Sequence, residues 1–330
     1  QLWLASGVAH TPMPSTFLLG RTLTAAFSLA TVGLAYANVD IAGVDIRVGV
    51  VAALAWAISP TSVRNGQFVT PDTFAVFWVM LSCWGSLGIL RRGRGVDYAI
   101  AAIAAGLATS TKYNAALTVL PMVVAHLMRG GLRGFRDIKL YASLALVGVA
   151  FLLTTPFALL DRHKFLQDIL WERAHYSSGH EGMEGEPVRW YLSYLWHVEG
   201  PLVFFALPSL IRDITSRNKS LLALSVFPLT YLGFISLFIV RNDRTLLPAI
   251  PFLLLLAASW LIYAYDRLQG RLPNARRFVR ALGPLLLLLG LTIPLSQTAR
   301  NDARLAGTDG RETARAWIAE NLPQGSRIAL

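Results

Sequence analysis

The sequence predicts an all-α polytopic membrane protein, and this prediction rests on its composition and on the length of its apolar runs. Hydrophobic residues make up 54% of the 330 residues, charged residues only 15%, and the mean hydropathy is +0.50. A soluble chain carries charge at nearer a quarter of its positions. Runs such as 17–37, 138–157 and 245–265 are long enough to cross about 30 Å of hydrocarbon. We therefore expect a bundle of membrane helices.

The apolar runs divide the chain into ten expected membrane segments, and the charges between the segments set their orientation. The segments are 17–37, 44–60, 70–90, 97–111, 112–128, 138–157, 195–211, 220–240, 245–265 and 278–297. Four connections are strongly basic, namely 91–94, 129–139, 212–219 and 266–280. Short basic loops face the cytoplasm, and with these four inside, every other connection falls outside without conflict. Membrane orientation thus explains the net charge of +11, and no nucleic-acid partner is expected.

The two segments 97–111 and 112–128 are expected to form a short, broken hairpin. Both flanking loops are basic, so the chain must enter and return within a length that is too short for two full crossings. Lys112 stands at the tip of this hairpin, among hydroxyl and amide side chains. Its polar neighbours favour an ammonium that faces a polar cavity at membrane depth. The alternative is a lysine that snorkels to the interface.

A polar stretch between two long apolar runs carries Arg64, Asn65 and Asp72. Pro60 is expected to end the run before it, and Pro71 to start the helix after it, because proline suits a first helical turn. Asp72 then lies at the N-terminal end of a membrane helix, where the helix macrodipole favours a carboxylate. The acid either only caps this helix or takes part in a site on the outer face, and its own position leaves both interpretations open.

The outer connection 158–194 is the longest one between segments. Residues 162–176 are expected to form an amphipathic helix in the interface, with Phe165 toward lipid. A glycine-broken acidic stretch follows, in which His180 and Glu181 are expected to belong to a loop that covers the substrate. A divalent metal ion is the alternative for these side chains, but no tight HxxxH or HExxH spacing supports it, and the metal ligands stay unknown.

A four-residue connection on the same face carries Arg241 and Arg244. Guanidinium groups bind phosphate oxygens in a bidentate manner, so this short turn is suited to an anionic group. The alternative is a simple surface ion pair between Asp243 and Arg244.

The chain is expected to divide into the end of an outer loop at 1–16, a membrane domain at 17–298 and the start of a truncated soluble extracytoplasmic domain at 299–330. In this tail, 311–323 alternates charged and apolar residues as a soluble amphipathic helix does, and 326–330 reads as a first strand. The sequence contains no GxGxxG and no Walker loop, so no nucleotide site is expected.

Several motifs together resemble the membrane part of the GT-C glycosyltransferases, specifically glycosyltransferase family 39 and its bacterial relatives. They are GRTLTAAFSLATVGLAY (20–36), SPTSVRNGQFVTPDTFAVFW (59–78), GLATSTKYNAALTVLP (106–121), RNDRTLLPAIPFLLLLAA (241–258) and AWIAENLPQGSRIA (316–329). The family includes protein mannosyltransferases that use dolichyl-phosphate-mannose, and aminoarabinose transferases acting on lipid A. Each motif is loose, but their order and spacing span nearly the whole chain.

The resemblance implies a GT-C type helical bundle that moves a sugar from a polyprenyl-phosphate donor to a protein, lipid or glycan acceptor. The implied site is on the extracytoplasmic face of a bacterial-type inner membrane. A first catalytic acid of the family lies in an outer loop that would precede Gln1, Asp72 matches a second acid, and Lys112 matches the hairpin lysine. The candidate site comprises Asp72 as the catalytic residue, Arg64, Asn65, Lys112, Tyr113, Arg241 and Arg244 as carrier-phosphate or substrate-binding residues, and His180 and Glu181 in the substrate loop.

Two other function classes remain open at this point. One is a transporter or flippase of an anionic lipid-linked substrate, against which stand the lack of an inverted repeat in the sequence and the gathering of polar residues on one face. The other is a non-catalytic membrane scaffold. A divalent metal ion is the only cofactor that these patterns suggest.

Overall fold

The computed structural model describes residues 13–179, 181–308, 310–323 and 326, and every regular element in these ranges is a helix. In chain order the helices are α2 (Met13–Ala42), α3 (Ile46–Ala57), α4 (Pro60–Gly66), α5 (Pro71–Arg91), α6 (Gly95–Thr111), η2 (Tyr113–Thr118), α7 (Val119–Gly130), η3 (Gly131–Arg136), α8 (Ile138–Thr154), α9 (Phe157–Leu160), α10 (Arg162–Ser178), α11 (Pro187–Tyr194), η4 (Leu195–Glu199), η5 (Pro201–Phe205), α12 (Ala206–Thr215), α13 (Lys219–Ile235), α14 (Asp243–Leu246), α15 (Ile250–Arg271), η6 (Pro273–Ala275), α16 (Arg276–Leu305) and α17 (Gly310–Asn321). The predicted all-α class is confirmed.

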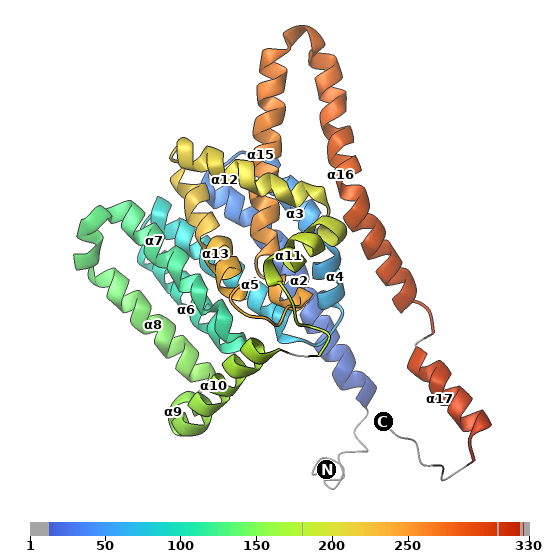
Figure 1. Ribbon diagram of the computed structural model, residues 1–330. Helices are drawn as coiled ribbons and strands as arrows, with labels where there is room; N and C mark the ends of the chain where they lie inside the picture. Colours follow the sequence, from blue (N-terminus) through green and yellow to red (C-terminus); the bar gives the residue numbers. More distant parts are fainter. Residues whose placement is uncertain (1–12, 180, 309, 324–325, 327–330) are drawn as a thin grey trace.

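The helices form one bundle with a projecting hairpin (Figure 1). Helices α6, α7 and α8 lie along one side of the bundle, and α16 runs along the other side. The far ends of α15 and α16 extend together beyond the rest of the chain, while α9, α10 and α17 lie toward the opposite end.

Length and composition select five helical stretches in the described residues that can cross a membrane. They are Thr16–Ala42, Pro71–Arg91, Tyr113–Arg136, Ile250–Arg271 and Arg277–Leu305. A sixth arises if α3 and α4, bent by 58° at their break, count as one crossing. Helices α8 and α13 are also apolar but have only 17 residues each. The expected number of ten segments stays a prediction.

Prolines and their caps define the polar stretch between α3 and α5. Pro60 begins α4, so it starts a helix as well as following the end of α3. The Ser59 hydroxyl accepts a hydrogen bond from the Ser62 amide at 3.2 Å and caps this short helix. Pro71 occupies the first turn of α5, as predicted. Arg64 and Asn65 are thereby presented on a separate, tilted helix, where the sequence alone predicted only a connection.

The stretch 195–211 is broken, although one membrane segment was expected there. The π-helical turn η4 ends at Glu199, and the next residue, Gly200, has a φ of 86°. Pro201 then starts η5, and α12 follows only after that turn. Glycine adopts positive φ without strain, and proline lacks the amide that would continue the helix, so these two residues set the break.

Small residues let α6 pack closely against two neighbours. A Cβ added to Gly85 of α5 would lie 2.6 Å from the backbone nitrogen of Ala101 in α6. A Cβ added to Gly106 would lie 2.6 Å from the carbonyl oxygen of Val147 in α8. Such close approach of backbones is the usual way in which membrane helices associate. This packing fixes α6, and with it the position of Lys112 at its end.

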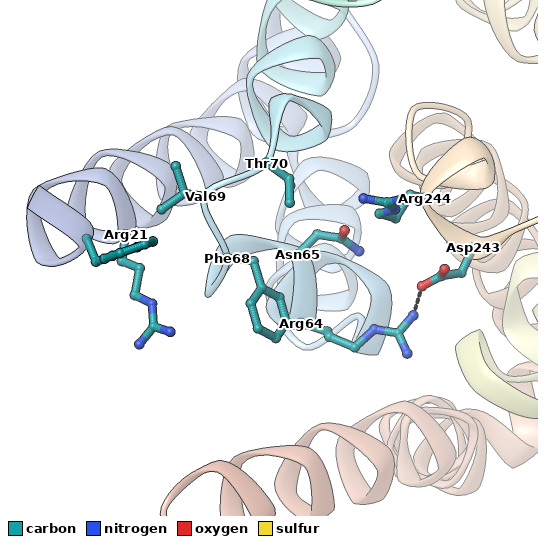
Figure 2. Close-up of a pocket in the computed structure, with 9 residues that line it drawn as sticks. Arg21, Arg64, Asn65, Phe68, Val69, Thr70, Asp243 and Arg244 are labelled. Carbon is teal, nitrogen blue, oxygen red and sulfur yellow. Dashed lines mark ion pairs between the residues drawn. The ribbon is translucent and has the colours of Figure 1, made fainter. Parts of the chain in front are cut away.

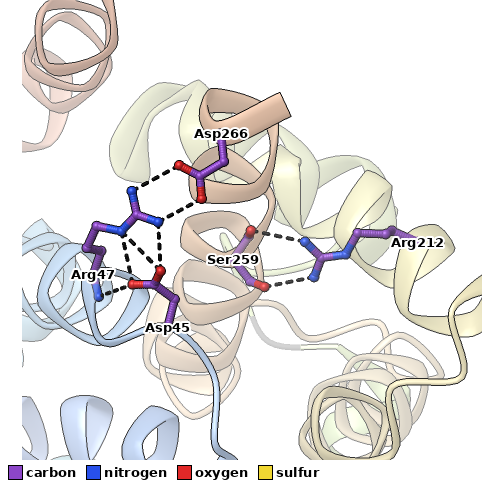
Figure 3. A network of polar contacts seen from close by, with 5 residues as sticks. All are labelled: Asp45, Arg47, Arg212, Ser259 and Asp266. Carbon is purple, nitrogen blue, oxygen red and sulfur yellow. Dashed lines mark hydrogen bonds and ion pairs between the residues drawn. The ribbon is translucent and has the colours of Figure 1, made fainter. Parts of the chain in front are cut away.

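The basic connections gather at one end of the bundle. Arg47 joins two carboxylates there, because its Nη2 lies 2.7 Å from an oxygen of Asp45 and 2.7 Å from an oxygen of Asp266 (Figure 3). Arg212 donates to the backbone carbonyl and the hydroxyl of Ser259 at 3.1 and 2.8 Å. The Arg47 pairs are exposed, so each contributes less than about 1 kcal/mol to stability.

Two further contacts bring the other basic connections to this end. Arg129 donates to the backbone carbonyl of Leu90 at 3.1 Å, and Lys219 donates to that of Met128 at 3.2 Å. Arg64 and Asp243, which lie beside two of the other connections, pair with each other at the opposite end. This separation agrees with the alternation of connections predicted from charge.

The C-terminal part agrees with the sequence analysis where it is described. Helix α16 continues to Leu305, so the expected boundary at 298 falls inside a helix. Helix α17 confirms the helix expected at 311–323. Of the expected strand 326–330, only Ser326 lies within the described residues, and the proposed domain boundaries stay a prediction.

Candidate active site at the polar end

A cationic pocket of about 440 Å³ opens between α2, α4 and α14 (Figure 2). It is lined by Phe17, Arg21, Arg64, Asn65, Phe68, Val69, Thr70, Asp243 and Arg244. Three guanidinium groups thus face the pocket against a single carboxylate. An excess of positive charge in a concave site attracts anionic ligands.

Arg64 and Asp243 form an ion pair at the edge of this pocket. Asp243 lies in the first turn of α14, and Arg64 comes from the last turn of α4. Arg64 Nη2 also lies 3.4 Å from the Tyr194 hydroxyl, to which it donates. Asp243 therefore pairs with Arg64 rather than with its neighbour Arg244, which the alternative surface-pair interpretation had expected.

Arg21 and Arg244 carry the positive charge of the pocket that Asp243 does not neutralise. Within the part of the chain that the structure describes, neither guanidinium makes a hydrogen bond or an ion pair, and both side chains are exposed. Figure 2 shows Arg244 approaching from α14 and Arg21 from α2, on the other side of the pocket. Arg244 was predicted from the sequence as a site residue, but Arg21 was not. The only indication for Arg21 in the sequence is its place in the motif at the beginning of α2.

Lys112 and Asp72 form a second ion pair, which the sequence analysis did not anticipate. Lys112 Nζ lies 2.6 Å from Asp72 Oδ1. Lys112 is extended, with φ −155° and ψ 117°, at the break between α6 and η2, which confirms the expected break in the hairpin. The Asp72 side chain is only 5% exposed and that of Lys112 is 22% exposed. The ammonium therefore has a polar partner inside the bundle, and the polar cavity expected around it stays a prediction.

Tyr176 of α10 is half-buried and packs edge-on against Phe238, with the ring centroids 6.1 Å apart. The pKa of its half-buried phenol is raised above the usual value, mainly because burial disfavours the phenolate. Among the smaller contributions, the charges of Glu172 and Asp72 raise the pKa and that of Arg244 lowers it. Sequence reasoning missed Tyr176, because nothing in α10 indicates that it faces inward.

Asn65 and Tyr113 have structural contacts of their own. Asn65 is buried, and its Nδ2 donates to the Thr61 carbonyl at 2.8 Å within α4. The ring of Tyr113 packs edge-on against Phe165, with centroids 5.7 Å apart. Phe165 therefore contacts the hairpin tip through an aromatic pair, and the expectation that it faces lipid stays a prediction.

Arg241 does not line the pocket. Its Nη2 donates to the Glu184 carbonyl at 2.5 Å, and its guanidinium lies over the Trp190 ring at 5.6 Å. Its backbone amide donates to the Met183 carbonyl at 3.0 Å. Arg241 thus holds the connection between α10 and α11 in place, and its expected contact with a carrier phosphate stays a prediction.

Of the two loop residues selected from the sequence, only Glu181 lies in the part of the chain that the structure describes. Glu181 is exposed in the connection between α10 and α11, and His180 lies outside the described residues. No group of three or more histidine, cysteine, aspartate or glutamate side chains in the described ranges is arranged to hold a metal ion.

A buried tyrosine joins the two halves of the site. The Tyr231 hydroxyl accepts from Asn114 Nδ2 at 3.1 Å and donates to the Thr245 carbonyl at 2.8 Å. Asn114 follows Lys112 by two positions, and Thr245 follows Arg244 directly. Tyr231 itself is fully buried. It therefore fixes the hairpin tip relative to α14.

Replacing Tyr231 with phenylalanine is expected to lower the melting temperature of the purified protein. The change leaves buried polar groups of Asn114 and Thr245 without their partner, which costs about 1–3 kcal/mol. Tyr191→Phe is the matched control, because the buried Tyr191 hydroxyl has no hydrogen-bond partner in the described residues. Its melting temperature is expected to stay level or to rise. An equal loss of melting temperature in both variants would rule out a specific role of the Tyr231 hydrogen bonds in stability.

Comparison with known proteins concerns the fold and the family of the chain. Residues 3–159, just under half of the chain, match a family model described as dolichyl-phosphate-mannose-protein mannosyltransferase. No curated protein matches the chain. The crystal structure of ArnT from Cupriavidus metallidurans in the apo state superposes with a TM-score of 0.57 at 18% identity, covering 85% of this chain. The chain has the GT-C fold.

This GT-C chain spans 60% of the length of the ArnT structure. A weaker match is the Archaeoglobus fulgidus oligosaccharyltransferase in complex with Zn and sulfate, with a TM-score of 0.49 and 15% identity over 92% of this chain and 43% of that one. Together with the apolar helices, the family match and the ArnT likeness identify an integral membrane protein.

Proposed function

We propose that this GT-C chain is the membrane part of a glycosyltransferase that takes its sugar from a polyprenyl-phosphate donor. The observation that carries the proposal is the pocket that Arg21, Arg64 and Arg244 line with a single carboxylate, together with the Lys112–Asp72 pair on the hairpin that Tyr231 joins to α14. The family model that matches residues 3–159 is described by a reaction of the same type, which supports the choice of donor.

The carrier phosphate would lie between Arg244 and Lys112. Arg244 has no partner in the described part of the chain, so all of its donors are available to phosphate oxygens. Lys112 has three ammonium hydrogens, of which the Asp72 contact uses one. These cations would stabilise the negative charge that builds on the phosphate oxygen as it leaves, which is the main electrostatic demand of the reaction.

Asp72 would handle the acceptor. In the transfer, the bond between the anomeric carbon and the phosphate oxygen breaks, and a bond to the acceptor hydroxyl oxygen forms. The hydroxyl proton must pass to a base, and Asp72 offers a buried carboxylate whose Oδ1 is held by Lys112. The sugar would be a hexose or a pentose, and the acceptor a protein, a lipid or a glycan.

The polar end is proposed to face outward from a bacterial-type inner membrane. The argument is the distribution of charge, because the four basic connections meet at the other end of the bundle, as cytoplasmic loops do. A polyprenyl-phosphate donor suits this location, since a lipid carrier supplies an activated sugar where nucleotide sugars are absent.

The test uses the full-length protein in detergent, a polyprenyl phosphate carrying a labelled sugar, and a membrane extract as the acceptor source. A transferase moves the label from the lipid carrier to an acceptor, and the reaction frees polyprenyl phosphate. A transporter leaves the donor intact in detergent, because no second compartment exists there, but moves the donor across the bilayer of proteoliposomes. Label that stays on the carrier in detergent while it crosses proteoliposomes would overturn the proposed transferase.

A further inference from the structure

Glu199 is a buried carboxylate that lies outside the pocket. It is only 3% exposed and is the last residue of η4, directly before the break at Gly200. Within the described residues it forms no ion pair with a lysine, arginine or histidine. A buried acid without a cation is costly unless hydrogen bonds hold it, so its contacts are expected to matter.

Two hydrogen bonds to Glu199 Oε1 come from Thr61 at the start of α4, and the carboxylate also contacts the side chain of Ser59, the N-cap of that helix. The Thr61 backbone amide donates to it at 3.2 Å, and the Thr61 hydroxyl donates to it as well. The first amides of a helix have no partner inside the helix, and a carboxylate satisfies them well. Glu199 therefore anchors the beginning of α4 to η4.

A second contact leads from the same threonine to the pocket. Thr61 Oγ1 lies 2.8 Å from the Tyr194 hydroxyl, and Arg64 Nη2 lies 3.4 Å from that hydroxyl. Thr61 and Arg64 are three positions apart, so they share one face of α4. The phenol keeps its proton, because burial raises the pKa of Tyr194 above its usual value. A continuous chain of polar contacts thus joins Glu199 to the Arg64 guanidinium.

We propose that Glu199 is a positioning residue, which acts through Thr61 and Tyr194 to direct Arg64 into the pocket. The identity of the ligand that Arg64 binds rests on the proposed function. The role of Glu199 in positioning α4 does not depend on that function. Thr61 and Arg64 lie at opposite ends of the seven-residue helix α4. The anchor holds the first turn of α4, and Arg64 lies on the same face one turn later, so the anchor sets the direction from which Arg64 reaches the pocket.

The first experiment measures hydrogen–deuterium exchange of α4 in the full-length protein. Glu199→Ala is expected to speed the exchange of the α4 amides at least about 10-fold, because it removes both contacts to Thr61. Glu199→Gln keeps an acceptor oxygen at the same place and is expected to stay close to wild type. Unchanged exchange in Glu199→Ala would overturn the proposal, whatever the ligand of the pocket is.

The second experiment is a double-mutant cycle read by the affinity for polyprenyl phosphate. Glu199→Ala is expected to weaken binding about 10- to 100-fold in wild type, the usual effect of losing a charge-assisted contact. In the Arg64→Ala background the same change is expected to alter affinity less than about twofold. Equal losses in both backgrounds would contradict a role through Arg64 and leave the carrier site intact.

Two controls keep the interpretation clear. Tyr194→Phe interrupts the path to Arg64 without touching the buried acid, so it is expected to weaken binding even if Glu199→Ala fails to fold. Asp213→Asn alters another buried acid, one held by Arg212 at 2.6 Å, and is expected to lower the melting temperature with affinity unchanged. If wild type binds no polyprenyl phosphate, the proposed function fails, and the exchange experiment alone decides on Glu199.

Discussion

Replacing Lys112 with alanine is expected to abolish sugar transfer in a protein that is still made and inserted into the membrane. Losing one preorganised donor to a developing negative charge costs about 10²–10³ in rate. Lys112 also holds Asp72 at 2.6 Å, so the change removes the partner of the acid at the same time. The measurement is the rate of label transfer from a polyprenyl-phosphate sugar, with the amount of inserted protein quantified in the same membranes.

Asp72, the partner of Lys112 in this ion pair, supplies the control for stability. Removing one member of a buried pair typically costs about 3–5 kcal/mol, because the other charge stays buried and unpaired. Lys112→Met alone is therefore expected to lower the melting temperature. Adding Asp72→Asn is expected to restore much of the melting temperature while transfer stays absent. Transfer at the wild-type rate in Lys112→Met would eliminate the role of this ammonium at the carrier phosphate.

Replacing Arg244 with alanine is expected to weaken the binding of polyprenyl phosphate about 10- to 100-fold, as befits a charged hydrogen bond to phosphate. Arg244 lines the pocket and has no partner elsewhere in the described chain, so its loss leaves no other group unpaired. The melting temperature is accordingly expected to stay near that of wild type. Affinity is measured by titration of the purified full-length protein with labelled polyprenyl phosphate.

Arg271→Ala is the matched control for Arg244. Arg271 is an exposed arginine in the last turn of α15, at the end of the bundle where the basic connections meet. Its loss changes the net charge by the same amount, so it separates a local contact from a general electrostatic effect. Equal weakening by both variants would contradict a phosphate site at Arg244.

Much of the architecture could be predicted from local patterns. The start of α5 at Pro71 and the break at Lys112 follow from a proline rule and from a length that is too short for two crossings. The separation of basic and other connections to opposite ends follows from charge. These features depend either on residues that are close in sequence or on the orientation rule for charged loops, which applies to every membrane segment in the same way.

The pairings within the site could not be predicted in the same way. Lys112 and Asp72 are 40 positions apart in the sequence, and Arg64 and Asp243 are farther apart still, so both pairs depend on how helices pack. Glu199 looked like part of an apolar segment, because the break that turns it toward Thr61 involves only Gly200 and Pro201.

The two arginines of the turn, Arg241 and Arg244, lie in different environments. A motif of two arginines on a short turn suggested that both bind one anion. In the structure Arg244 faces the pocket, while Arg241 turns to the backbone of Glu184 and the ring of Trp190. Residue type alone cannot distinguish these two environments, since guanidinium groups bind carbonyl oxygens and aromatic faces as readily as phosphate.

The most direct test of the proposed carrier site is the structure of the full-length protein with polyprenyl phosphate bound. The account predicts that the phosphate oxygens lie about 2.7–3.2 Å from donors of Arg244 and Lys112, in the region between α14 and the hairpin tip. A phosphate bound instead at the basic end, near Arg47 and Arg212, would contradict the account, because every step proposed for Lys112 and Asp72 requires the leaving group beside them.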